Sequence, residues 1–143
     1  AAPPIRGVDT SKVEYRESGG LAWGTGNSPI TYDPPISDPT ELQVELQAEP
    51  EGSGLVPCYQ QVEPARQLVN LTDIPVLFMN GEGGYHRIFD HCLANWLNQA
   101  GVETEYVLME DVGLPGNGHM MMLELNSKEI AQYIHGWLEE NVL

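Results

Sequence analysis

One histidine lies in a stretch rich in glycine, and its residue type suits acid–base chemistry. His119 closely follows Gly113, Pro115, Gly116 and Gly118. Imidazole takes up and releases a proton near neutral pH, which is what a general base must do. Glycine allows backbone conformations that other residues avoid, so such a loop can hold a side chain in a defined place. We therefore expect His119 to be a general base. The alternative is a surface histidine in a flexible loop.

A general base needs a nucleophile, and the chain offers no obvious one. The G-x-S-x-G pattern of a nucleophile elbow is absent, because residues 26–30 lack its second glycine and residues 17–19 lack its first. Cys58 and Cys92 are poor nucleophiles if they pair with each other. Glu82 is the best acid within the chain, because it follows a predicted strand and has glycines around it; the alternative is a solvated loop carboxylate. The chain thus holds a base without a nucleophile.

Several side chains near this histidine invite other interpretations. His86 is expected either to line the pocket or to lie on the surface at a helix start. A metal site made of His86, His91 and His119 is not expected, because no two of them have a known ligand spacing. The three methionines that start at Met120 suit packing better than copper binding. Met120 itself is expected beside the pocket, and no cofactor is implied.

The C-terminal part, residues 64–143, reads as alternating strands and helices. Residues 74–81 form an apolar run opened by proline and closed by glycine, which predicts a buried parallel strand. Apolar residues at helical spacing predict a helix over residues 85–100, and residues 104–109 predict a second strand. A last helix is expected after Asn126, with a capping box that includes Glu129. This pattern predicts a βαβα arrangement with the glycine-rich loop at the carboxyl edge of a parallel sheet, where ligands bind.

The N-terminal part, residues 1–63, is punctuated by proline and glycine every few residues. We expect it to be an irregular cap or pocket wall, with one short strand within residues 42–46. Trp23 and Tyr32 are large groups that this wall could turn toward the pocket. Just beyond it, residues 65–68 could form a helical turn. Two strands cannot bury both faces of a sheet by themselves, so more strands must come from elsewhere.

Charge and composition limit the partners and the cellular location that we expect for the chain. The 143 residues carry 21 acidic and 6 basic groups and a net charge of −15, which disfavours nucleic acid and anionic membrane surfaces as partners. No apolar run reaches the roughly 18 residues of a membrane span. Asn70 lies in the glycosylation sequon Asn-Leu-Thr. Cys58 and Cys92 are expected to form one disulfide, with two free thiols as the alternative. Together these features favour an extracellular location.

The tail of the chain resembles the C-terminal end of an α/β-hydrolase, most closely a branch of secreted bacterial and fungal serine esterases. The resemblance rests on G-N-G-H-M-M-M at residues 116–122, on the strand at 74–77 and on the helix end at Ala100 and Gly101. Residues 29–35 and 63–68 also resemble segments of the fungal members. The fold implied is the last part of an α/β-hydrolase sheet, incomplete without an N-terminal chain.

This resemblance implies a division of the active site between two chains. The family order is serine, then acid, then histidine. The serine, the oxyanion hole and the acid are then expected upstream of Ala1, at a processed or cut end, on a companion chain from the same precursor. Many other α/β-hydrolases carry the acid after the seventh strand, where Glu82 lies, so Glu82 stays the alternative. The activity implied is hydrolysis of a small carboxylic ester or lactone; the alternative is a non-catalytic binding protein of the same fold.

Overall fold

The structure is a computed structural model, and it describes residues 31–37 and 39–143. Its central unit is a strand, a helix and a second strand. Strands β3 (Val76–Asn80) and β4 (Thr104–Leu108) pair in parallel, and helix α1 (Asp90–Gln99) connects them. Helix α2 (Ser127–Asn141) ends the chain. The predicted parallel βαβα order is therefore present in residues 64–143.

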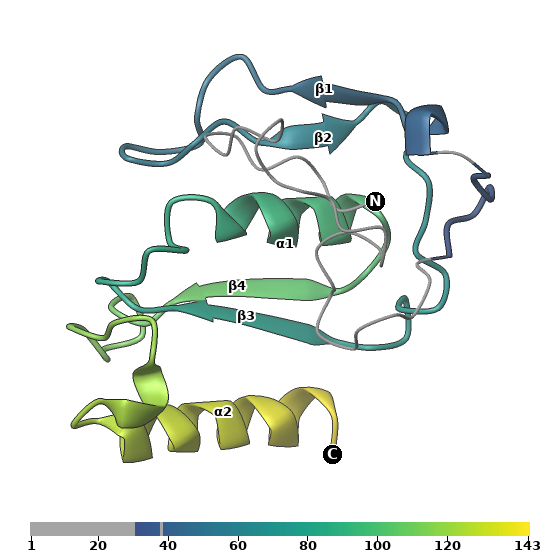
Figure 1. Ribbon diagram of the computed structural model, residues 1–143. Helices are drawn as coiled ribbons and strands as arrows, with labels where there is room; N and C mark the ends of the chain where they lie inside the picture. The colour runs from purple at the N-terminus through teal and green to yellow at the C-terminus, as the bar shows by residue number, and fades with distance from the viewer. Residues whose placement is uncertain (1–30, 38) are drawn as a thin grey trace, which may run out of the picture.

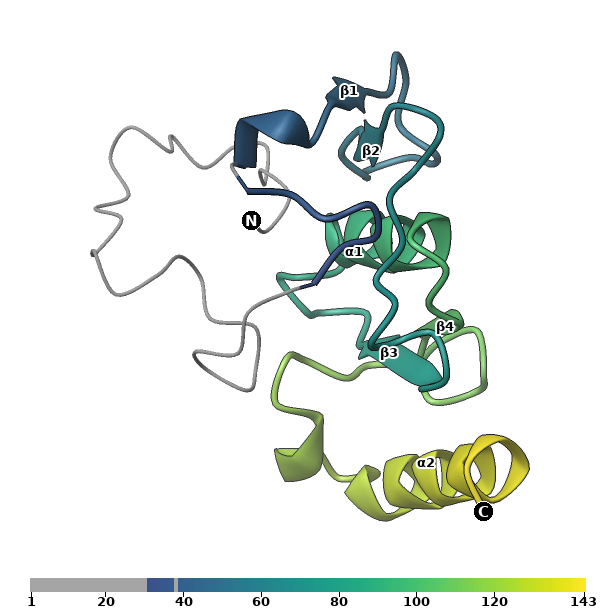
Figure 2. The same ribbon diagram turned by 90° about the vertical axis from the view of Figure 1, so that its right-hand side faces the viewer.

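The elements stack in layers that both ribbon views show (Figures 1 and 2). The β3–β4 sheet lies between α1 and α2, and a small antiparallel ribbon lies on the outer side of α1. This ribbon pairs β1 (Val44–Leu46) with β2 (Tyr59–Gln61). A 3-10 helix, Pro39–Glu41, precedes it. The short strand expected within residues 42–46 is present, but its partner β2 was not foreseen.

Each face of the β3–β4 sheet has its own apolar core, because side chains alternate across a strand. On the α1 face, Val76 and Phe78 pack against a buried cluster: Tyr32, Leu68, Leu97, Ala100 and Val102. On the α2 face, Leu77 and Met79 pack against a second cluster: Val107, Met109 and Ile130. Trp137 of α2 also donates a 2.6 Å hydrogen bond from Nε1 to Glu105 Oε2 of β4. The two-sided burial agrees with the continuous apolar run of β3.

Three local predictions differ from the structure. The helix predicted from residue 85 begins at Asp90, because residues 84–89 form turns whose side chains make other contacts. The helical turn predicted at residues 65–68 is extended, since Gln67 exchanges two 2.8 Å backbone hydrogen bonds with Asp33. Asn126 stands at the N-cap of α2 as predicted, but its side chain makes no capping hydrogen bond. In the first two cases tertiary contacts override the local sequence preference.

No helix of the described residues is both long enough and apolar enough to cross a membrane.

Candidate functional site

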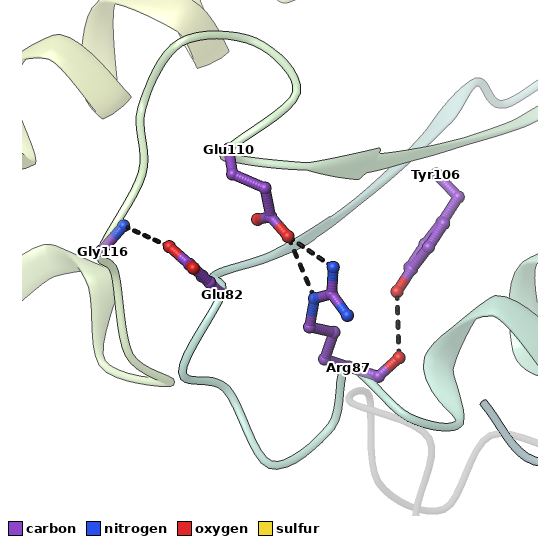
Figure 3. Close-up of polar contacts among 5 residues, drawn as sticks. All are labelled: Glu82, Arg87, Tyr106, Glu110 and Gly116. Atoms are coloured by element: carbon purple, nitrogen blue, oxygen red, sulfur yellow. Dashed lines mark hydrogen bonds and ion pairs between the residues drawn. The ribbon is translucent and has the colours of Figure 1, made fainter. Parts of the chain in front are cut away.

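The loops that leave the carboxyl ends of β3 and β4 are joined to each other. The amide of Gly83 donates a 2.9 Å hydrogen bond to the carbonyl of Asn117, and the amide of Gly116 donates a 3.1 Å bond to Glu82 Oε2 (Figure 3). The backbone of Gly81 lies against Asn117 so closely that a Cβ there would overlap the Asn117 carbonyl. The sequence thus brings two distant glycine-rich segments into backbone contact at one sheet edge.

Asn117 fixes the shape of the loop that follows β4. It is 1% exposed, and its Nδ2 donates to the carbonyl of Leu114 at 2.6 Å. Gly113 and Gly116 adopt positive φ angles of 81° and 78°, a region that favours glycine. The amide of Gly118 donates to Glu124 Oε1 at 3.0 Å. These contacts determine where the next residue, His119, leaves the loop.

His119 is exposed in this chain, and aromatic rings surround one side of it. Its ring stacks on His86, with centroids 4.8 Å apart and planes inclined by 11°. The ring of Tyr85 lies at 4.6 Å, tilted by 49°. Within the described residues, no hydrogen bond joins the His119 ring to a carboxylate. The role of general base stays a prediction, and the geometry leaves both ring nitrogens open to other groups.

His86 is half-buried and has a carboxylate partner. Its Nδ1 lies 3.2 Å from Asp90 Oδ1, and the other carboxylate oxygen of Asp90 accepts a 3.0 Å hydrogen bond from Asn80 Nδ2. Asn80 is 4% exposed at the end of β3. His86 therefore contacts His119 on one side and the partly buried Asp90 carboxylate on another. A pocket-lining role for His86 stays a prediction, and the residue lies in the turns before α1 and not at the helix start.

Glu82 lies at the same edge but points at the loop backbone. Its carboxylate accepts the hydrogen bond from Gly116 (Figure 3). Among the described residues, no hydrogen bond joins Glu82 to the His119 ring. Its role as the acid stays a prediction. A carboxylate in this position acts, in the structure, as a tie between the two loops.

Sequence reasoning missed an ion pair at this edge. Arg87 Nε and Nη2 both donate to Glu110 Oε1, at 3.0 Å and 2.6 Å, and Tyr106 Oη donates to the Arg87 carbonyl at 3.4 Å (Figure 3). Burial acts to raise the pKa of Glu110, but a backbone hydrogen bond and the Arg87 guanidinium outweigh it, so the net pKa lies below its usual value. The sequence signal that could have found this ion pair is the position of Glu110. It follows the end of β4 by two residues and so lies at the same sheet edge.

The predicted disulfide is present. Cys58 and Cys92 are joined, with their Cα atoms 5.0 Å apart, and this bond ties the β1–β2 ribbon to α1. His91 lies beside it and is 4% exposed. The sulfurs and the imidazole are close enough to ligate one ion, but both sulfurs are held in the covalent bond. The oxidised pair therefore has no thiolate with which to bind a metal.

The remaining predicted site residues are spread over the chain. Trp23 lies outside the described residues. Tyr32 is 4% exposed in the core against α1, and its role in a pocket stays a prediction. Met120, directly after His119, is 51% exposed. Asn70, the predicted glycosylation site, is exposed in a turn between β2 and β3.

Among known proteins, the chain is similar to the probable secreted lipase phiG of a fungus (Fungal sp., strain ATCC 74256). The two are 34% identical over 119 residues, which is 82% of this chain and 32% of the relative. The chain therefore spans about a third of the length of that curated relative. No protein-family model and no solved structure matches it. The chain is thus related to a secreted lipase, and this relationship confirms the extracellular location expected from the sequence.

Proposed function

We propose that this chain is the histidine-bearing C-terminal part of a secreted serine hydrolase that cleaves carboxylic esters or lactones. The observation that carries the proposal is the position of His119. It leaves a loop held by backbone hydrogen bonds at the carboxyl end of the parallel sheet, where α/β folds bind their ligands. The named activity of the fungal relative supports ester hydrolysis as the chemistry.

In this proposal His119 moves the proton in both halves of an acyl transfer. It takes the proton of a serine hydroxyl as the oxygen attacks the acyl carbon, and it gives that proton to the departing alkoxide. It then deprotonates a water that attacks the acyl-enzyme, and it returns the proton to the serine oxygen. A base in this role needs one ring nitrogen for the serine and the other for an orienting acid. Among the described residues neither ring nitrogen of His119 has a hydrogen-bond partner, so one can serve the serine and the other the acid.

The serine, the oxyanion hole and the acid belong, in this proposal, to a companion chain of the same precursor. Two features of the described residues support a companion. The β3–β4 sheet has only two strands, and large apolar side chains are exposed after His119: Met120, Met122, Leu123 and Leu125. Several large exposed apolar side chains in one short segment are typical of a surface that another part of a protein covers. The fungal relative, which extends far beyond the matched part, leaves room for such a companion.

A non-catalytic binding protein of the same fold is the second candidate. It is favoured by one observation, that His119 has no carboxylate partner among the described residues. In that case the aromatic surface formed by Tyr85, His86 and His119 would contact a ligand without reacting with it.

Labelling of the assembled protein with a fluorophosphonate, a probe that reacts with activated serines, tests the proposal. We expect the companion chain to be labelled and His119→Ala to abolish the labelling. His135→Ala is the matched control, because His135 is exposed on α2 and should leave labelling unchanged. Undiminished labelling of the His119→Ala protein would refute the role of this histidine, and an unlabelled parent would favour the binding protein. Glu82→Gln distinguishes Glu82 from an acid on the companion chain. Activity should survive this substitution if the acid lies on the companion chain, and it should be lost if Glu82 is the acid.

A further inference from the structure

The orientation of the His119 ring depends on aromatic contacts. Its imidazole has no hydrogen bond within the described residues, whereas it stacks on His86 with planes 11° apart and contacts the tilted ring of Tyr85. Tyr85 is 64% exposed, so little holds its own ring in place. The His86 ring is held in place more firmly than the Tyr85 ring, because His86 is half-buried and hydrogen-bonded.

A line of contacts connects His86 to the interior of the fold. Asn80, buried at the end of β3, donates to Asp90 at 3.0 Å, and Asp90 meets His86 Nδ1 at 3.2 Å. Asp90 is the first residue of α1, so this carboxylate is placed by a helix and a strand together. The ring of Phe89 also lies 5.0 Å from the His86 ring. The orientation of the His86 ring is thus constrained by regular secondary structure, not by loop residues alone.

We infer that His86, held by Asp90 and Asn80, is a positioning residue that sets the plane of the His119 ring. The inference rests on the proposed function of His119. A base must hold its nitrogen within hydrogen-bond reach of the proton that it abstracts, and a displacement of about 1 Å can lower a rate about 100-fold. A ring that turns freely about its side-chain bonds would sample such displacements continually. Stacking on an anchored ring removes this freedom without occupying either nitrogen of His119.

Three variants of the assembled enzyme separate the ring contact from the hydrogen bond. His86→Ala removes both, His86→Phe keeps a flat ring but loses the bond to Asp90, and Asp90→Ala removes the anchor alone. We expect His86→Ala to lower kcat for p-nitrophenyl butyrate by about 10- to 100-fold with KM unchanged. His86→Phe should restore most of that loss, and Asp90→Ala should lower kcat by a smaller factor.

Two controls make the outcomes distinguishable. His135→Ala should match the parent, and His119→Ala should abolish activity; if His119→Ala stays active, the proposed function fails. If instead only His119→Ala is inactive and His86→Ala has the parent's kcat, the positioning role alone is wrong. The positioning role is equally overturned if His86→Ala raises KM without changing kcat, or if His86→Phe is as impaired as His86→Ala. Circular dichroism and an intact disulfide in each variant would show that the fold is retained.

Discussion

Gly81 is the position where a single added methyl group should disturb the loop that carries His119. Gly81 directly follows β3 and is buried, and the backbone of Asn117 lies directly against it. A Cβ on Gly81 would lie 2.7 Å from the carbonyl carbon of Asn117 and 2.9 Å from its Cβ, and closer still to its oxygen. Because the opposing atoms are mainly backbone, no side-chain rotation can relieve the overlap.

The magnitude follows from these distances. Carbon atoms in contact normally lie about 3.5–4.0 Å apart, so the loop has to retreat by about 1 Å. Overpacking of this kind costs about 1–3 kcal/mol, and the loss of the Gly83-to-Asn117 hydrogen bond adds about 1 kcal/mol. We therefore expect Gly81→Ala to lower the free energy of unfolding by about 2–4 kcal/mol. If His119 moves with the loop by that distance, kcat should fall by about 100-fold.

Denaturant unfolding and steady-state ester hydrolysis of the assembled protein measure the two effects. Gly136→Ala is the control, because a Cβ in this part of α2 meets nothing within 4 Å. It should stabilise the protein by about 0.5–1 kcal/mol through the helix preference of alanine over glycine. The reasoning is refuted if Gly81→Ala is as stable and as active as the parent, because the contact between the two loops would then be too loose to position anything.

Three further predictions concern other parts of the molecule. Replacing Cys58 and Cys92 by serine opens a loop with a sequence separation of 34 residues and should lower the free energy of unfolding by about 4 kcal/mol, measured by denaturant titration; parent-like stability would contradict it. The Glu110 pKa is lower in the folded state than in the unfolded chain, so the stabilisation that it provides is full above about pH 4.3 and is lost as pH falls through the folded pKa. Thermal unfolding from pH 7 to pH 3 should therefore show a difference between the parent and Glu110→Gln that shrinks in acid, and a constant difference would exclude this linkage. Asn70 should carry a glycan in a eukaryotic secretion host, so the intact mass should fall on enzymatic deglycosylation of the parent and not of Asn70→Gln.

Elements with a strong apolar pattern could be predicted from the sequence. The run before Asn80 and the run before Met109 became the two parallel strands, with ends within two residues of those expected. The disulfide also followed from the sequence, since two cysteines in an extracellular chain leave a single pairing. In each case one physical requirement, burial on both faces or oxidation, decides the outcome without knowledge of distant contacts.

Elements that depend on distant partners could not be predicted in this way. Residues 65–68 look helical by themselves, but Gln67 pairs with Asp33, over 30 residues earlier. The first turn expected of α1 is replaced by turns in which Arg87 reaches Glu110 across the sheet edge. The β2 strand has no apolar alternation, since two of its three residues are glutamine. It is stabilised by its pairing with β1, which the sequence of β2 alone does not indicate. Local propensity is a weak guide wherever a backbone or charged group finds such a partner.

The geometry around His119 also bears on which acid would complete the site. Glu82 is close in the fold, but its carboxylate already accepts a hydrogen bond from the amide of Gly116. Hydrogen bonds to charged groups contribute about 1.5–3 kcal/mol, so this contact holds the Glu82 side chain toward the loop backbone. A rotation of Glu82 that broke this bond would untie the loop that presents His119, so it would improve the orientation of the ring at the cost of its placement. An acid from outside the described residues would leave this tie in place, and among the described residues neither nitrogen of His119 has a hydrogen-bond partner. If His119 is the base, as proposed, this edge suits an acid from outside the described residues, with Glu82 serving as a loop tie.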